Sequence, residues 1–321
     1  MNNYYQKRTS VDFNKAQDYL ELCNSADEAF KTEPSVIQTE ICKNNYEVLE
    51  SYHASSNCKA ILYRNGDEYI VSFFGTDFRN LKDIGTNVTM VAGKSPKQFK
   101  DAENFVGEMI NKYNIPQNKL TAIGNSEGGS EAIHIKGVFG IKEAYTFNGY
   151  IPKLSQYPDY NLESNIYNFR TEGDIVSKAG HVVGEDFVVP VNLKDGKNPK
   201  WGPFGTAEWH RIENMGDCRN SQPASVYEQN NPEWKNKYIK GELKSYEVED
   251  IPKELYALFD DAINDRLRNG AVVNAPRPVS YNTHSGRTGC AGTYQVSGYT
   301  RNDGVQVSSY YRTCGFPHNN A

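Results

Sequence analysis

The chain has 321 residues, enough for one large hydrophobic core and a smaller appendage. Its formal net charge of −5 at pH 7 gives no general attraction for nucleic acid, so we do not expect a nucleic-acid-binding protein. No stretch is long and apolar enough to be a transmembrane helix, and residues 1–13 lack the apolar centre of a signal peptide. We therefore expect a protein that is cytoplasmic as synthesised, or one exported without a cleaved signal.

The six cysteines form no Cys-x-x-Cys pair and no cluster with histidines, so we expect no metal site and no cofactor. Cys290 and Cys314 bracket a short repeat near the end of the chain. In an oxidising compartment they would be able to pair, and the alternative is that they are free thiols.

The first part of the chain predicts one helix followed by a hairpin. Apolar residues at helical spacing indicate a helix over residues 13–31. Two β-rich runs, 58–64 and 68–74, flank Asn65-Gly66, which is a strong hairpin signal. Residues 77–96 are expected to be loop, and an amphipathic helix is expected to start at Pro96 and end near Tyr113.

The next part predicts strands that alternate with helices. Strands are expected at 120–124, 143–148, 165–170 and 186–191, and a helix after the first of them. This alternation is typical of an α/β fold with a mostly parallel sheet flanked by helices. Residues 192–250 show few periodic runs, whereas 253–268 predicts a further amphipathic helix.

The domain organisation predicted from these patterns is a main domain, residues 1–270, and a linker with a small β-hairpin tail, residues 271–321. The tail contains a repeat with a period of 11 residues, since Val296-Ser297-Gly298-Tyr299-Thr300-Arg301 is echoed by 307–312. Asn302-Asp303-Gly304 lies between the copies and favours a hairpin turn.

The sequence Gly124-Asn125-Ser126-Glu127-Gly128 has the Gly-x-Ser-x-Gly form of a nucleophile elbow. In such an elbow a strand turns sharply into a helix, and the glycines remove side chains that would clash. The predicted strand before Ser126 and the predicted helix after it provide the required context. We therefore expect Ser126 to be a nucleophile.

A serine nucleophile needs a base and a carboxylate that orients the base. Asp174 follows a predicted strand at the edge where Ser126 is expected, which makes it a better carboxylate than Asp159 or Asp186. His210 is the first choice of base, because the connection from Asp174 is long enough to return to that edge. His181 lies closer to Asp174 in the chain and is the second choice.

Stabilisation of an oxyanion needs two hydrogen-bond donors. The backbone N–H of Glu127, at the start of the predicted helix, is one candidate. The N–H of Thr76, at the end of the strand 68–74, is the other.

The segments IVSFFGTD (70–77), TAIGNSEGGSEA (121–132), FRTEGDIVS (169–177) and WHRIENM (209–215) resemble successive blocks of class 3 lipase-like α/β hydrolases. The resemblance covers roughly residues 45–215. It implies a catalytic triad of Ser126, Asp174 and His210, with Thr76 and Glu127 at the oxyanion hole. It also implies a lid over 78–95, in which Val88, Met90 and Val91 would cover the site; the alternative is that they are ordinary core residues.

The expected function is that of a serine esterase or lipase acting on carboxylic esters of lipids. A phospholipase that acts as an exported bacterial effector, with transient contact to a membrane surface and a protein partner for the tail, is a finer version of this hypothesis. Glu127 favours an alternative, because it places a carboxylate beside the nucleophile. In that alternative the chain is a catalytically silent hydrolase fold that serves as a binding module.

Overall fold

The computed structural model describes residues 11–32, 46–75, 84–150, 165–174, 176–177, 181–193 and 209–231, together with short strands between 293 and 313. For residues 26–32 and 84–96 and for the strands after 293 it describes the backbone alone. The chain divides into two units, Met1–Pro276 and Arg277–Ala321, and each is described below by itself.

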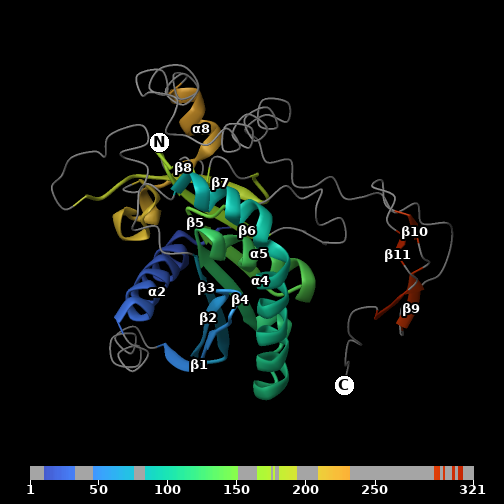
Figure 1. Ribbon diagram of the computed structural model, residues 1–321. Helices are drawn as coiled ribbons and strands as arrows, with labels where there is room; N and C mark the ends of the chain where they lie inside the picture. The colour runs from blue at the N-terminus through green and yellow to red at the C-terminus, as the bar shows by residue number, and fades with distance from the viewer. Residues whose placement is uncertain are drawn as a thin grey trace, which may run out of the picture. The chain divides into compact units, whose positions relative to one another are not determined.

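The first unit is built on an eight-stranded sheet in which the strands lie in the same order as in the chain (Figure 1). Strands β3 to β7 run parallel to one another, whereas β1 and β2 at one edge and β8 at the other are antiparallel to their neighbours. The predicted mostly parallel sheet is thereby confirmed. The strands are β1 (Glu47–His53), β2 (Lys59–Asn65), β3 (Glu68–Phe74), β4 (Leu120–Asn125), β5 (Glu143–Phe147), β6 (Ile166–Thr171), β7 (Glu185–Val189) and β8 (Gln222–Pro223).

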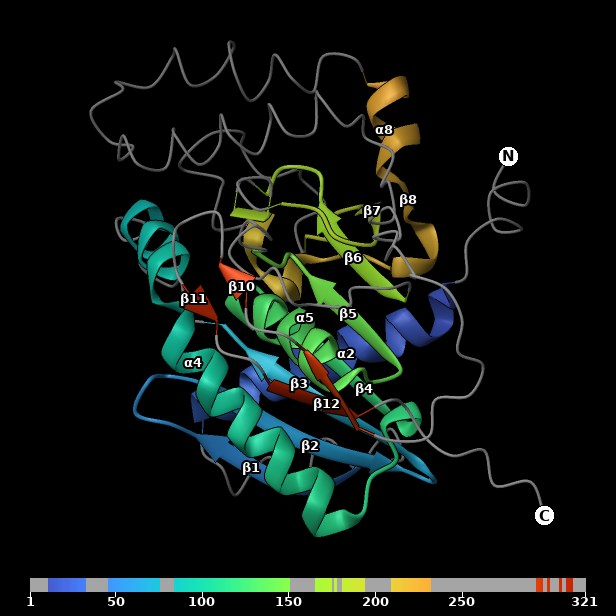
Figure 2. The ribbon, with the colours of Figure 1, turned by 90° about the vertical axis from the view of Figure 1, so that its right-hand side faces the viewer.

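Helices cover both faces of this sheet. Helix α2 (Phe13–Thr32) lies on one face, and α4 (Ile84–Tyr113) and α5 (Glu127–Phe139) lie on the other, as the two perpendicular views show (Figures 1 and 2). Helix α8 (Ala224–Asn230) contacts β7 and β8. Three short 3-10 helices complete the described elements: η3 (Gln117–Lys119), η5 (Ile212–Asn214) and η6 (Cys218–Asn220). Among the described helices, none combines the length and apolarity needed to cross a membrane.

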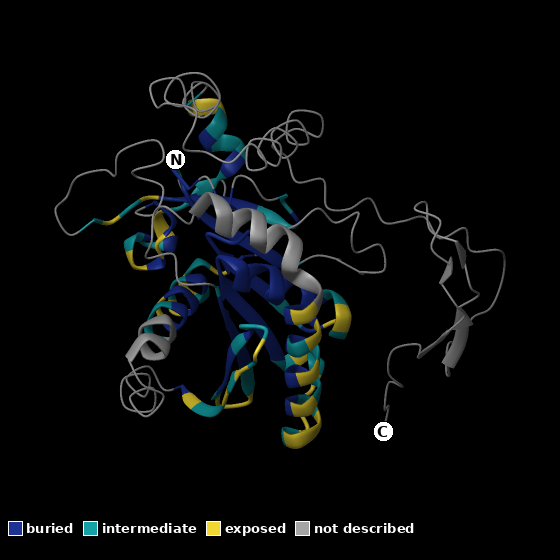
Figure 3. Ribbon diagram, in the orientation of Figure 1, coloured by how far each residue is buried: buried dark blue, intermediate teal, exposed yellow. Residues whose placement is uncertain are grey.

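The two faces of the sheet belong to two separate cores, because side chains alternate along a strand. In β2, Ile61 and Tyr63 pack in the core under α2, whereas Ala60 and Leu62 pack in the core under α4 and α5. The central strand β4 is buried along its whole length, and so is the first half of α5 (Figure 3). The strand-to-helix junction at Ser126 therefore lies in the buried centre of the unit.

The structure confirms the helix predicted at 13–31 and the hairpin at Asn65-Gly66, where Gly66 has a φ of 62°. The predicted start of the next helix is wrong, since α4 begins at Ile84 and includes Pro96. A proline removes one helical hydrogen bond but keeps a helical φ, so it does not have to stand at a helix start. The helix expected at 253–268 lies outside the described residues.

The sequence patterns did not predict β1, β8, α8 or the three 3-10 helices of the first unit. Strand β1 is half-exposed and contains two glutamates, a serine and a histidine among its seven residues, so it lacks the apolar run used to find the others. Helix α8 spans only seven residues and has only two buried ones, Ala224 and Tyr227. Short or half-exposed elements leave little hydrophobic periodicity to detect.

The second unit contains two antiparallel strand pairs. Strands β9 (Thr293–Val296) and β12 (Tyr310–Thr313) pair with each other, as do β10 (Tyr299–Thr300) and β11 (Gln306–Val307). Both pairs share one register, in which Val296 lies opposite Tyr310 and Tyr299 opposite Val307. Each valine of the repeat is thus paired with the tyrosine of the other copy. Cys290 and Cys314 lie outside the described residues.

Candidate active site

Ser126 lies at the junction between β4 and α5, as the elbow motif predicts. Its backbone has a φ of 54° and a ψ of −125°, a region that side-chain-bearing residues rarely adopt. Three backbone hydrogen bonds hold this conformation. The Ser126 N–H donates to the carbonyl of Phe147 at 3.1 Å, and the Ser126 carbonyl accepts from the N–H groups of Gly129 and Tyr150 at 3.1 and 3.0 Å.

The two glycines of the motif are required by close backbone approaches. A Cβ on Gly124 would lie 2.1 Å from the carbonyl oxygen of Gly128. A Cβ on Gly128 would lie 2.3 Å from the carbonyl oxygen of Phe73 at the end of β3. Since contacts below 3.0 Å force backbone to shift, only glycine lets α5 start this close to the sheet.

The structure brings Ser126, His210 and Asp174 together in one hydrogen-bonded chain. Nε2 of His210 lies 2.8 Å from Oγ of Ser126, and Nδ1 of His210 lies 2.9 Å from Oδ1 of Asp174. These residues come from three separate places: the start of α5, the segment before η5 and the end of β6. All three are buried, with exposed fractions of 2%, 4% and 0%. This is the arrangement of a nucleophile, its base and the carboxylate that orients the base.

The carboxylate of Asp174 is held in place by the backbone that follows it. The N–H of Val176 donates to Oδ1 at 3.0 Å, and the N–H of Ser177 donates to Oδ2 at 3.3 Å. Donors on both oxygens compensate the burial of this charge and fix the plane of the carboxylate. The plane of the carboxylate in turn sets the direction in which Nδ1–H of His210 points.

Of the two predicted oxyanion donors, only Glu127 lies among the described residues. The N–H of Glu127 opens α5 beside Ser126, where the helix dipole favours negative charge. Gly75 leaves the space in front of it clear, because a Cβ on Gly75 would lie 2.7 Å from Cβ of Ser126 and 3.0 Å from N of Glu127. The other predicted donor, Thr76, and the predicted lid side chains Val88, Met90 and Val91 lie outside the residues whose side chains and contacts are described.

The charge of Glu127 acts on two other buried groups. Its charge raises the pKa of Glu131, one helical turn further on, and that of Cys58, although burial is the larger cause for both groups. Cys58 directly precedes β2, two strands from β4 in one direction, whereas Asp174 follows β6, two strands away in the other. The carboxylate beside the nucleophile therefore also acts on this buried cluster.

His134 and Asp186 have other partners than Ser126. His134, further along α5, stacks on Phe99 and contacts Oε1 of Glu103 at 2.9 Å; burial lowers its pKa. Asp186 forms a buried ion pair with Arg170 at 2.9 Å. Asp159 lies outside the described residues. Among the described residues, no group of three His, Cys, Asp or Glu side chains is arranged to hold a metal ion.

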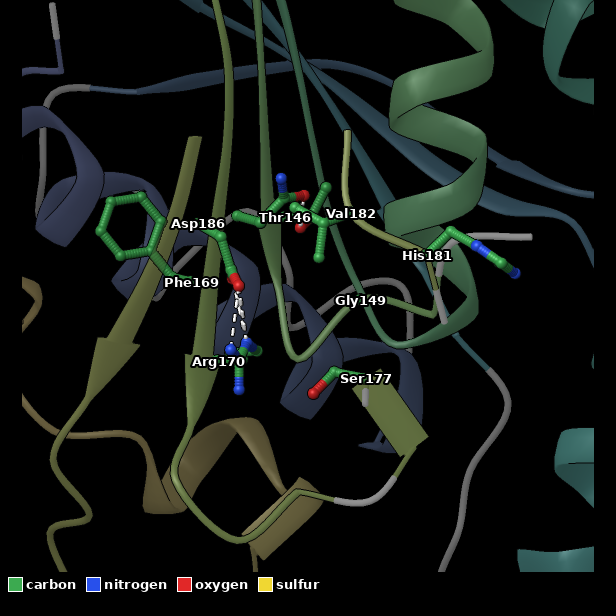
Figure 4. Close-up of a pocket in the computed structure, with 9 residues that line it drawn as sticks. Thr146, Gly149, Phe169, Arg170, Ser177, His181, Val182 and Asp186 are labelled. Atoms are coloured by element: carbon green, nitrogen blue, oxygen red, sulfur yellow. Dashed lines mark hydrogen bonds and ion pairs between the residues drawn. The ribbon is translucent and has the colours of Figure 1, made fainter. Parts of the chain in front are cut away.

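His181, the second choice of base, lines a small cavity together with Ser177, whose N–H donates to the carboxylate of Asp174. The cavity has a volume of about 10 Å³, enough for one water molecule and far below the roughly 300–1,000 Å³ of ligand pockets. Figure 4 shows the Arg170 guanidinium and the Asp186 carboxylate facing each other at this place. The lining residues are Thr146, Gly149, Asn168, Phe169, Arg170, Ser177, His181, Val182 and Asp186.

Sequence reasoning missed Asn148, which contacts the backbone of His210. It is fully buried, and its φ of 47° lies in the left-handed region. The available signal was the dipeptide Asn148-Gly149 at the end of the predicted strand 143–148, since asparagine before glycine favours a positive φ. Its contacts with residues about 60 positions later have no counterpart in local sequence.

No protein-family model matches the chain, and no curated protein matches it significantly. Among solved structures it is similar to a Yarrowia lipolytica lipase, with 16% identity and a TM-score of 0.41 over 58% of this chain and 80% of that one. A Rhizomucor miehei triacylglyceride lipase gives 14% and 0.41 over 58% and 83%. Lipase II from Rhizopus niveus gives 12% and 0.39 over 58% and 82%. Similarity this distant assigns the chain neither a family nor an activity.

Proposed function

We propose that this chain is a serine hydrolase that cleaves carboxylic esters, with Ser126 as nucleophile, His210 as general base and acid, and Asp174 as the orienting carboxylate. The observation that carries the proposal is the pair of hydrogen bonds of His210, 2.8 Å to Ser126 and 2.9 Å to Asp174. A buried serine at a strained turn, with an imidazole in hydrogen-bond reach, fits a nucleophile better than a residue that only stabilises the fold.

The reaction has two halves. In the first, Oγ of Ser126 attacks the acyl carbon while Nε2 of His210 takes its proton, and His210 then gives that proton to the leaving alcohol. The N–H of Glu127 stabilises the oxyanion of the tetrahedral intermediate. In the second, His210 activates a water that attacks the acyl-enzyme, which releases the acid and restores Ser126. Asp174 keeps His210 in the required tautomer throughout.

A fluorophosphonate probe tests this assignment directly. We expect it to label the wild type, and to label neither Ser126→Ala nor His210→Ala. Ser51→Ala, a change at an exposed position of β1, serves as the matched serine control and should be labelled normally. His181→Ala should also be labelled. If His181→Ala were not labelled while His210→Ala was labelled normally, His181 would be the base.

The lipid part of the hypothesis is supported by the sequence resemblance. We propose lipid esters as substrates, with phospholipids among them, and a transient contact with the membrane surface. Rates on p-nitrophenyl esters of increasing chain length, followed by triacylglycerol and phosphatidylcholine vesicles, test it. Activity confined to short soluble esters would leave an esterase without the lipid specificity.

The role of an exported effector with a tail partner is a separate proposal. Its support is the division of the chain into two units, Met1–Pro276 and Arg277–Ala321, of which the first contains Ser126, Asp174 and His210. Deletion of 277–321 should leave ester hydrolysis unchanged and abolish delivery. Loss of hydrolysis in a folded truncation would contradict this division.

The binding module remains the alternative, and Glu127 beside the nucleophile is the observation that favours it. An ester assay with the wild type and Glu127→Gln separates the two. A folded wild type that neither hydrolyses p-nitrophenyl esters nor reacts with the probe would support the silent fold.

A further inference from the structure

Asn148 is the first residue after β5 and connects the ends of three segments. It is fully buried, and its φ of 47° is one that asparagine tolerates better than most residues. Every polar atom of its side chain is used. Nδ2 donates to the carbonyl oxygens of Trp209 and His210, both at 3.1 Å, and Oδ1 accepts from the N–H of Thr171 at 2.8 Å.

Thr171, the last residue of β6, adds a second contact to the same peptide. Its hydroxyl donates to the carbonyl oxygen of Trp209 at 2.5 Å. That carbonyl therefore accepts two hydrogen bonds, one from the end of β5 and one from the end of β6. The backbone on either side of His210 is held through two successive carbonyl oxygens, those of Trp209 and His210. Its position and its rotation are both fixed, because the two oxygens are held separately.

The turn that contains Asn148 also holds the nucleophile. The carbonyl of Phe147 accepts from the Ser126 N–H, and the N–H of Tyr150 donates to the Ser126 carbonyl. Residues 147–150 thus contact the backbone of Ser126 on one side and, through Asn148, the backbone of His210 on the other. This turn therefore connects the backbone of the nucleophile with the backbone of its base.

We propose that Asn148 is a positioning residue for the hydrolytic reaction: together with Thr171 it fixes the His210 backbone so that the imidazole stays in line with both Ser126 and Asp174. This inference depends on the proposed function. Its physical basis is that proton transfer requires hydrogen-bond geometry, and a misplacement of about 1 Å costs on the order of 100-fold in rate.

The central variant is Asn148→Gly, because glycine accepts the left-handed φ and removes only the amide. We expect kcat on p-nitrophenyl butyrate to fall about 10- to 100-fold, with KM within about threefold of wild type. The kcat of Asn148→Asp should fall further, since its carboxylate would face two carbonyl oxygens. Asn114→Gly is the matched control, because Asn114 also has a positive φ of 52° but is exposed after α4; its kcat should be unchanged.

Rates are expressed per active site, counted as the amount of protein labelled by a fluorophosphonate at completion. A residue with a purely structural role would lower the melting temperature and the number of labelled sites but leave kcat per labelled site unchanged. An Asn148→Gly protein whose kcat per labelled site is within twofold of wild type would overturn the proposal.

A second pair of variants keeps the proposal testable if the Asn148 variants fail to fold. Thr171→Val removes the hydroxyl at nearly constant shape and should lower kcat per site several-fold, whereas Thr171→Ser should restore it. Equal rates for Thr171→Val and wild type would refute the role of this contact. Failure of the proposed function gives a different result, because the wild type itself would then remain unlabelled.

Discussion

The backbone strain at Ser126 predicts a reversal of the usual order of alanine and glycine. Replacing Ser126 by either residue removes the hydroxyl and its bond to His210 equally, so the two variants differ only in how they tolerate a φ of 54° and a ψ of −125°. A residue with a Cβ pays about 1–3 kcal/mol in such a region, and glycine loses about 0.5–1 kcal/mol through its unfolded-state entropy. Ser126→Gly should therefore be more stable than Ser126→Ala by about 1–2 kcal/mol.

The measurement is thermal and urea unfolding of both variants under identical conditions. For a unit of this size the difference corresponds to melting temperatures about 2–6 °C apart. The control pair is Asn104→Ala and Asn104→Gly, at an exposed position of α4 with ordinary helical backbone. There alanine should be the more stable by about 1 kcal/mol. If the Ser126 pair follows the same order as the Asn104 pair, the elbow stores no strain and the reasoning is refuted.

Three further predictions follow from buried contacts. Burial raises the pKa of Glu131 well above its usual range, so the folded state keeps a proton that the unfolded state releases as the pH rises above the ordinary carboxyl pKa. The wild type should lose stability relative to Glu131→Gln by up to about 1.4 kcal/mol per pH unit above that point; urea titrations between pH 5 and 8 check this, and parallel pH curves would contradict it. Gly173→Ala would place a Cβ 2.1 Å from the ring of Trp209, the residue before His210. Displacement of this ring should slow fluorophosphonate labelling at least tenfold. An unchanged labelling rate would show that the ring moves without affecting His210. Arg170→Met leaves Asp186 buried without its guanidinium partner and should destabilise the fold by about 3–5 kcal/mol; Arg170→Met combined with Asp186→Leu should recover most of the loss in urea unfolding, and equal destabilisation by the single and double changes would argue against the ion pair as the cause.

The parts of the fold that sequence predicts are those with strong local patterns. The β4 run into Gly124-Asn125-Ser126 specifies a buried strand, a sharp turn and a helix within a few residues, and the structure has all three. Asp174 was selectable because it follows a predicted strand, and His210 because the connection from Asp174 is long enough to return to the same edge; the structure brings both to Ser126. Local pattern and tertiary position agree there.

The hydrogen bonds of Asn148 and Thr171 to the backbone around His210 were not predictable in the same way. Asn148 reads as a turn residue, and its bonds to Trp209 and Thr171 exist only because β5 and β6 are neighbours in the sheet. Likewise, the start of α4 was misplaced because Pro96 resembles a helix start, although the helix continues through it. Features that depend on pairing between distant segments leave no periodic signal in one sequence.

The chain-order arrangement of the eight strands has a consequence for how the protein is made. As the ribosome releases the chain, each strand emerges next to the partner that has just preceded it, so the sheet can grow outward from β1 without waiting for later segments. The serine is in place early, but its imidazole follows 84 residues later. An unfinished chain thus carries Ser126 without His210, so the proposed triad can form only when the segment just before β8 has been made.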